Sequence, residues 1–509
     1  MKKVLLDGFS LKLKDAYNII FNNYSVEISD KSLIRVEECS KTVQNFVENS
    51  DVVYGITTGF GSLKNVAIPK EKTEELQRNL LRSHASGWGE PLPYEITRGM
   101  LLLRLNAMLK GHSGVKKETV FLMKEFLNHG FYPYIPSRGS VGASGDLAPL
   151  AHMALCLIGE GEFFVDGKRI SSSIVLNNHG LKPLSLSAKE GLALINGTQL
   201  MTSIAIKLIK ELGELINISA LSASLSLEAL MGTRTAFRKE IHEIRPQSGQ
   251  IAIANLIFNI TENSNIIESH SECDRVQDPY SLRCIPQVIG AVIDTWTHAK
   301  DIVSIEINSV TDNPVIVNGN EVLSGGNFHG EPIAFILDFL SIAMTKMANI
   351  SERRIERMVN NQLSPHLPPF LVKNSGVNSG FMIVQYLAAS LVSECKALSH
   401  PGSVDSIPTS SNQEDHVSMG PVSGFKALQI LENLKTIITI ELLIGAQATD
   451  FIDAESAPII KKLRQEIRKE VSFMENDRII SYDIEKLRNA VISGRFLNII
   501  TGGGLSIIE

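Results

Sequence analysis

The stretch from Ser423 to Ala454, SGFKALQILENLKTIITIELLIGAQATDFIDA, decides the fold. It contains no proline, and apolar side chains occupy most of the circumference that a helix of this sequence would have. A helix that is apolar on nearly all sides is buried, either in a bundle or between subunits. Five more stretches share this character: 198–232, 286–308, 332–361, 379–399 and 482–498. The sequence therefore predicts a mainly α fold with a large central bundle of long helices.

The part of the chain before these helices has a different character. Residues 1–197 mix short helical patterns with glycine-rich loops such as YGITTGFGS, which starts at Tyr54. We predict a smaller, loop-rich part over residues 1–197 and a long-helix bundle domain over residues 198–509. The segment EFFVDGKRI predicts a minor β hairpin around Asp166-Gly167. Asp146 is a suitable N-cap for a helix over the sequence DLAPLAHMALCLIG.

Composition and charge limit the compartment and the partners. The 509 residues are 44% hydrophobic and 20% charged, with a net charge of −6 and no long run of like charges, so nucleic acid is not an expected partner. The stretch TIITIELLIGA is interrupted by Glu441 and falls short of the ~20 residues that span a bilayer. The first apolar run ends at Asp7, too early for a signal peptide. We expect a cytoplasmic protein without a membrane partner.

Cysteine and histidine usage bears on metals. The cysteines are odd in number and form no C-x-x-C pair, which favours a reducing compartment and argues against structural zinc. Their positions are Cys39, Cys156, Cys273, Cys284 and Cys395. Apart from His84, the histidines do not cluster at ligand spacing, and we interpret His329, His400 and His416 as residues of loops or of the surroundings of a site. We expect no catalytic metal.

The tripeptide Ala143-Ser144-Gly145, within SRGSVGASGDLAPLAH, is the main candidate for chemistry. A hydrolase nucleophile elbow requires G-x-S-x-G, and here the residue two after Ser144 is Asp146, so this interpretation fails. Small residues in a tight loop can bring the Gly145 nitrogen to the Ala143 carbonyl carbon. Ring closure and loss of water, including the Ser144 hydroxyl, would leave an electrophilic methylidene group.

This segment resembles the self-formed 4-methylidene-imidazol-5-one group (MIO) of the aromatic amino acid ammonia-lyases and aminomutases. Residues 1–500 are similar to the histidine ammonia-lyase branch in YGITTGFG, LLRSHASGWG, INGTQ, VQDPYSLRC, SGGNFHGEP, NSGFMI and TSSNQEDHVSM. The resemblance implies an autocatalytic cyclisation, no external cofactor, and a homotetramer whose core is formed by the long helices and whose active sites are shared between subunits. It implies loss of ammonia from L-histidine to give trans-urocanate, the first step of histidine degradation.

The resemblance also implies roles for individual residues. Tyr54 would be the base for the β-proton, and because tyrosine has a reference pKa of ~10, we expect the site to lower the pKa of Tyr54. Arg283 offers a planar fork for the substrate α-carboxylate. The remaining implied roles are hydrogen bonding and proton transfer for Gln277 and Tyr280, hydrogen bonding to MIO for Asn196, and packing beside MIO for Phe328.

Two positions indicate the substrate. His84, preceded by Ser83 as in histidine lyases, can contact an imidazole, and Glu414 can accept an N–H from its ring. Thr57 and Gly330 depart from the usual asparagine and alanine of this branch, and threonine at position 57 is known from tyrosine lyases. The alternatives are therefore a tyrosine or phenylalanine ammonia-lyase or an aromatic aminomutase. A non-catalytic helical scaffold is a further alternative, disfavoured because Tyr54, Ser144 and Arg283 are all present.

Overall fold

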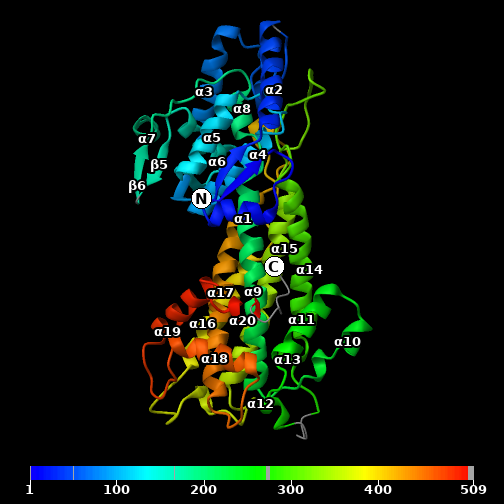
Figure 1. Ribbon diagram of the computed structural model, residues 1–509, viewed down its shortest axis with the longest axis vertical. Helices are drawn as coiled ribbons and strands as arrows, with labels where there is room; N and C mark the ends of the chain where they lie inside the picture. Colours follow the sequence, from blue (N-terminus) through cyan, green and yellow to red (C-terminus); the bar gives the residue numbers. More distant parts are fainter. Residues whose placement is uncertain (1, 50, 166, 271–275, 502–509) are drawn as a thin grey trace. The chain divides into compact units, whose positions relative to one another are not determined.

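The structure is a computed structural model that describes residues 2–49, 51–165, 167–270 and 276–501 (Figure 1). The fold is mainly α, as predicted. The chain divides into two compact units: unit 1 is Met1–Lys207, Lys300–Asp338 and Pro401–Phe425, and unit 2 is Leu208–Ala299, Phe339–His400 and Lys426–Glu509. The units are interleaved along the chain, whereas the predicted division is a single cut after residue 197.

The apolar stretches predicted to be long helices are helices, with ends that differ by a few residues. They are α9 (Gln199–Ala229), α14 (Ile285–Glu306), α15 (Glu331–Val359), α16 (Met382–Leu398) and α17 (Gly420–Thr449). The last predicted stretch is divided into α19 (Ile480–Ile492) and α20 (Leu497–Thr501). Gly494 has a φ of 71° and ends α19, since this left-handed conformation is the common C-terminal stop of a helix.

Within unit 2, a buried charge joins α9, α15 and α17. Glu441, on α17, is fully buried and forms two contacts with the Arg354 guanidinium, Nε to Oε1 at 2.5 Å and Nη2 to Oε2 at 2.9 Å. The hydroxyls of Ser222, Ser226 and Ser351 also donate to its carboxylate. The glutamate that interrupts the most apolar part of the chain is therefore held by five hydrogen bonds, which offset its desolvation.

The other α-helices of unit 2 are α10 (Lys239–Glu243), α11 (Ser248–Ile260), α12 (Asn265–Glu268), α13 (Tyr280–Arg283) and α18 (Pro458–Glu470).

Unit 1 contains several helices of 6 to 19 residues. Of these, α3 (Thr73–His84), α6 (Leu147–Leu157) and α8 (Glu190–Ile195) pack against one another. The others are α1 (Leu13–Phe21), α2 (Asp30–Glu48), α4 (Tyr94–Met108), α5 (Lys117–His129) and α7 (Ser172–Asn178). The predicted hairpin is present as β5 (Glu162–Val165) paired antiparallel with β6 (Lys168–Ser171), although Asp166 lies outside the described residues.

Three further strand pairs were not predicted. β1 (Lys3–Leu6) pairs in parallel with β2 (Ser25–Ile28), while β3 (Trp88–Pro91) with β4 (Pro136–Arg138) and β7 (Val315–Val317) with β8 (Glu321–Leu323) are antiparallel. Each strand has three or four residues, too few to show a clear alternation of polar and apolar side chains.

Helix α15 is the one helix in the described part of the chain that is long and apolar enough to cross a membrane. Of its most apolar window, 67% is buried inside the protein, as is usual for a core helix of a helical bundle. The stretch TIITIELLIGA lies inside α17 and is buried.

We expect Glu441→Leu to lower the free energy of unfolding by about 3–5 kcal/mol, because it leaves the Arg354 guanidinium buried without a counter-charge. The double variant Glu441→Leu/Arg354→Met removes both charges and should lose less. Denaturant and thermal unfolding of both variants measure this difference. Glu75→Gln, in the exposed pair with Lys72, is the control and should change stability by less than about 0.5 kcal/mol. Equal losses in the single and double variants would contradict the expectation.

Candidate active site

A cavity of about 440 Å³ in unit 1 brings together five residues that the resemblance names: Tyr54, Ser144, Asn196, Phe328 and Glu414. They come from five separate regions of the sequence and lie on loops or at helix ends. The cavity is also lined by Gly61, Lys64, Asn65, Asn313, Ser324, Gly325 and Gln413. The lining is largely polar, with a serine, a phenol and a carboxylate in one cavity, so it can bind a polar ligand and transfer protons.

The tripeptide Ala143-Ser144-Gly145 is sharply bent. Ser144 has a φ of 50° and Gly145 a φ of 78°, both in the left-handed region. A Cβ added to Gly145 would lie 2.2 Å from the carbonyl oxygen of Gly197. The Asp146 N–H donates to this same oxygen at 2.7 Å. The bend thus lies in close contact with the backbone just before α9, and only glycine fits at position 145.

The role of Asp146 differs from the prediction. It stands directly before α6, but its side chain makes no capping hydrogen bond to that helix. Its carboxylate instead accepts the N–H groups of Leu200 at 2.8 Å and Met201 at 3.2 Å, in the first turn of α9. Burial raises the pKa of Asp146 to about 7, against the opposing effect of these two hydrogen bonds. Asp146 therefore connects the bend to α9, as a cap of a helix far along the chain.

Glu414 follows the 3₁₀ turn η5 (Ser410–Asn412) and is the acidic centre of the cavity. The Ser144 hydroxyl donates to its Oε1 at 3.3 Å, and the Thr409 hydroxyl donates to its Oε2 at 2.8 Å. Both carboxylate oxygens therefore have a donor from this chain, one of them from the residue that is predicted to lose its hydroxyl.

Tyr54 lies in the glycine-rich loop and is half-buried. Burial raises the pKa of its phenol, and the negative charge of Glu414 raises it further, while a hydrogen bond from the Gly61 N–H opposes the change. The net direction is upward. We expected the site to lower the pKa of Tyr54. The groups that this chain places around the phenol raise it, so for these groups the expectation is wrong.

His84, at the last position of α3, is close enough to Glu414 for the carboxylate to raise its pKa. Burial has the larger effect, so the pKa of His84 is lowered overall and the imidazole is neutral at pH 7. Its Nδ1 lies 2.9 Å from the Leu80 carbonyl oxygen, which can only accept, so Nδ1 carries the proton. Nε2 then keeps a lone pair that can accept an N–H.

Asn196 ends α8 and is buried. Its backbone oxygen accepts from Arg104 Nη1 at 2.6 Å, and its Nδ2 donates to the Asn313 carbonyl at 3.4 Å. Its Oδ1 is buried without a hydrogen-bond partner among the described residues. A buried unpartnered oxygen at the cavity wall is suited to a ligand or a modified backbone group.

Sequence reasoning did not identify several lining residues. Lys64 Nζ donates to Gln413 Oε1 at 2.6 Å and thereby joins the Tyr54 loop to the Glu414 loop. The Asn313 side chain accepts from the N–H of Gly325 at 2.7 Å and from Ser324. The Asn313-Pro314 dipeptide signalled a turn, whereas Lys64 has the local sequence of an ordinary surface lysine.

Gln277, Tyr280 and Arg283 belong to unit 2 and are not among the residues that line this cavity. Tyr280 is 70% exposed. The Arg283 guanidinium lies over its ring at 4.4 Å, and Arg283 Nε donates to the Asp278 carbonyl at 3.0 Å.

The two departures from the family pattern have local explanations. The Thr57 hydroxyl donates to the Asp51 carbonyl at 2.5 Å and accepts from the Val53 N–H at 2.9 Å, so it shapes its own loop and does not line the cavity. A Cβ added to Gly330 would lie 2.3 Å from the Met201 sulfur. The space of the usual alanine methyl is therefore taken by Met201.

Two histidines gather near the cavity, contrary to the prediction that the histidines do not cluster. Each of His329, Glu331 and His416 offers one atom that can ligate a metal, and these three atoms lie within 4.8 Å of one another. The cluster was missed because its members come from distant parts of the sequence.

Comparison with known proteins agrees with this site. The family model for aromatic amino acid lyases matches residues 11–469. The chain is 48% identical to a histidine ammonia-lyase of Alkaliphilus oremlandii, over 98% of this chain and 99% of the relative. Among solved structures, it resembles a tyrosine aminomutase of Streptomyces globisporus (TM-score 0.93, 36% identity, 98% of each chain). It also resembles a histidine ammonia-lyase of Trypanosoma cruzi (TM-score 0.90, 39% identity, 100% of this chain and 98% of that one). With this match and the cavity around Ser144, the chain belongs to the aromatic amino acid lyase family.

Proposed function

We propose that this protein is a histidine ammonia-lyase, a carbon–nitrogen lyase that converts L-histidine into trans-urocanate and ammonia at the first step of histidine degradation. The observation that carries the substrate is Glu414, which accepts the Ser144 hydroxyl at the Ala143-Ser144-Gly145 bend. His84 does not line this cavity, but the Glu414 carboxylate raises its pKa, which supports the same substrate. The names of the curated relatives support the same substrate. Thr57 does not line the cavity, so it does not favour a tyrosine or phenylalanine substrate.

The residues around Ser144 fit a methylidene-imidazolone formed from the tripeptide. Ser144 and Gly145 both have positive φ values, and Gly145 pairs with Gly197, so the tripeptide is held in a tight bend of the kind that ring closure between the Gly145 nitrogen and the Ala143 carbonyl carbon requires. The unpartnered Oδ1 and the Nδ2 of Asn196 are the polar groups placed to hold it. When formed, the group supplies the electrophile that makes elimination of ammonia possible.

Cyclisation also changes the state of Glu414. In the uncyclised chain, the Ser144 hydroxyl occupies Oε1 of Glu414. Loss of that hydroxyl as water leaves Oε1 without this donor, so Oε1 can accept an N–H from a substrate ring. The same dehydration therefore both prepares the electrophile and opens the binding site for the ring.

An imidazole matches one acceptor in the cavity, Glu414, and one outside its lining, His84. His84 Nε2 and the Glu414 carboxylate can each accept an N–H, and a protonated imidazole has two N–H groups to offer. A phenyl ring would leave both acceptors without partners, at a cost of about 1–3 kcal/mol each. This difference favours L-histidine over phenylalanine. A phenol could satisfy only one of them.

Tyr54 is the base proposed for the β-proton. Because burial and Glu414 raise its pKa, the phenolate requires a positive charge nearby, which the substrate and Arg283 can supply. We assign Arg283 to the α-carboxylate, with Gln277 and Tyr280 beside it as hydrogen-bonding and proton-transfer residues. The exposure of Tyr280 on its own chain is what a residue that completes a neighbouring subunit's site would show.

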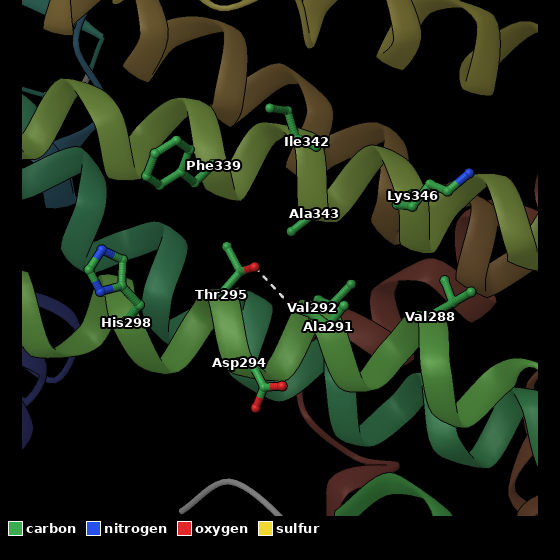
Figure 2. Close-up of a pocket in the computed structure, with 10 residues that line it drawn as sticks. All are labelled: Val288, Ala291, Val292, Asp294, Thr295, His298, Phe339, Ile342, Ala343 and Lys346. Carbon is green, nitrogen blue, oxygen red and sulfur yellow. Dashed lines mark hydrogen bonds between the residues drawn. The ribbon is translucent and has the colours of Figure 1, made fainter. Parts of the chain in front are cut away.

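The surface of unit 2 supports the homotetramer. A groove of about 470 Å³ lies between α14 and α15, and Figure 2 shows Ala343 of α15 and Thr295 of α14 pointing into the space between the two helices. Phe339 and Ile342 also line the groove. Phe339 and Ile342 are 43% and 48% exposed. Large apolar side chains left exposed on a long helix are suited to burial against another subunit.

The four described cysteines are free, in keeping with a cytoplasmic location, while Cys273 lies outside the described residues.

The tripeptide can be tested by mass. We expect the wild-type chain to be lighter than its sequence by two water molecules. Ser144→Ala should lack the methylidene group, lose turnover and keep its oligomeric state. Gly145→Ala should stay uncyclised, because its Cβ would collide with the Gly197 carbonyl oxygen. Gly167→Ala, where nothing lies near the added Cβ, is a matched positive-φ control and should cyclise. A fully active, uncyclised wild type would contradict the proposal.

Glu414→Gln should change both substrate use and pH dependence. With L-histidine, kcat/KM should fall about 10-fold or more, because a charged acceptor is lost. The base acts when deprotonated, so a raised pKa of Tyr54 places the rise of kcat/KM at high pH. Removing the negative charge lowers that pKa, and the rise should move to lower pH. Urocanate absorbance across pH measures both effects. Thr409→Val is the control that keeps the charge. A shift to higher pH would refute this electrostatic argument.

Shared active sites can be tested by mixing inactive variants. Tyr54→Phe and Arg283→Met should each be inactive alone as homotetramers. Co-expressed, they should regain part of the wild-type activity if a site takes Tyr54 and Arg283 from different subunits. Tyr54→Phe mixed with Glu414→Ala is the control, since both residues line one cavity of one chain. Recovery in the control alone would contradict the arrangement, and so would a monomer in sedimentation.

A further inference from the structure

The cluster of His329, Glu331 and His416 has the composition of a metal site. His329 lies in the loop before α15, Glu331 is the first residue of α15, and His416 lies in the loop that carries Glu414. His329 Nδ1 is 3.9 Å from Glu331 Oε2, and the two imidazole rings are stacked with centroids 5.7 Å apart. The cluster lies wholly within unit 1.

A second observation concerns the carboxylate. Glu331 Oε2 is buried and has no hydrogen-bond partner among the described residues. A buried carboxylate oxygen without a hydrogen-bond donor is desolvated with no compensating interaction. A cation between it and the two imidazoles would offset that cost in free energy.

The imidazoles are free to act as ligands. The Glu331 N–H lies 3.4 Å from His329 Nδ1, a long and weak hydrogen bond that a metal ion at Nδ1 would replace. His416 is exposed, so its ring can turn without disturbing a packed core.

We propose that His329, Glu331 and His416 bind one divalent first-row metal ion, with Zn²⁺ as the best match. Two imidazoles and one carboxylate are a common ligand set for such ions. Zn²⁺ bonds of about 2.0–2.2 Å require donors about 3.4 Å apart in a tetrahedron. The donors here lie within 4.8 Å of one another, so the side chains must draw together by up to about 1.4 Å on binding.

The bound ion would join two loops that form the candidate active site. His329 directly follows Phe328, and His416 lies two residues after Glu414. The metal is thus a clamp between these loops and does not contact the substrate. This inference is independent of the proposed reaction, because it rests on the ligand set alone.

The experiment is a titration of the metal-free full-length protein with Zn²⁺ by calorimetry, with Co²⁺ absorption as a second measurement. We expect one Zn²⁺ per chain and a rise in the thermal midpoint of unfolding. His329→Ala, His416→Ala and Glu331→Gln should each weaken binding at least 10-fold. The double variant His329→Ala/His416→Ala should lose the thermal rise.

His400→Ala is the matched control, since His400 is an exposed histidine outside the cluster, and it should bind as the wild type does. Because His416 is exposed, His416→Ala tests the site without loss of folding, which the thermal transition without metal verifies. The proposal is overturned if the wild type takes up no Zn²⁺, or if the double variant binds it as tightly as the wild type, which would place the ion elsewhere, for example on the cysteines.

Discussion

The close approach of Gly145 to Gly197 is the constraint around which the site is built. The carbonyl oxygen of Gly197 occupies the place of any side chain at position 145 and also accepts the Asp146 N–H. The Asp146 carboxylate then holds the first turn of α9. The bend, Asn196 and the start of the longest helix are therefore positioned together. A displacement of any one of them would change the bend of the tripeptide backbone.

Glu414 controls the electrostatics of the cavity. It raises the pKa of the Tyr54 phenol, adds to the basicity of His84, and accepts the Ser144 hydroxyl. One carboxylate thus influences the proposed base, the proposed ring acceptor and the modified residue. Lys64 also lines the cavity, where its ammonium group donates to Gln413, so the cavity holds one carboxylate and one ammonium group.

Prediction from sequence succeeded where the signal was local or carried by resemblance. The apolar circumference of residues 423–454 predicted α17, and the motifs placed Tyr54 and Glu414 in one cavity. Prediction failed where residues far apart in the sequence interact. Asp146 reads as a cap for the helix that follows it, yet its partners are at positions 200 and 201. Similarly, no spacing rule could reveal the meeting of His329 with His416, or that Met201 fills the space beside Gly330.

The interleaving of unit 1 along the chain has a consequence for biosynthesis. A ribosome that has translated the first 300 residues has produced the glycine contact and Asn196, but neither Phe328 nor Glu414. The complete cavity exists only after residue 425 has left the exit tunnel. Nascent chains therefore lack a complete active-site cavity during most of their synthesis. Truncated products that lack the last fifth of the chain cannot form this cavity.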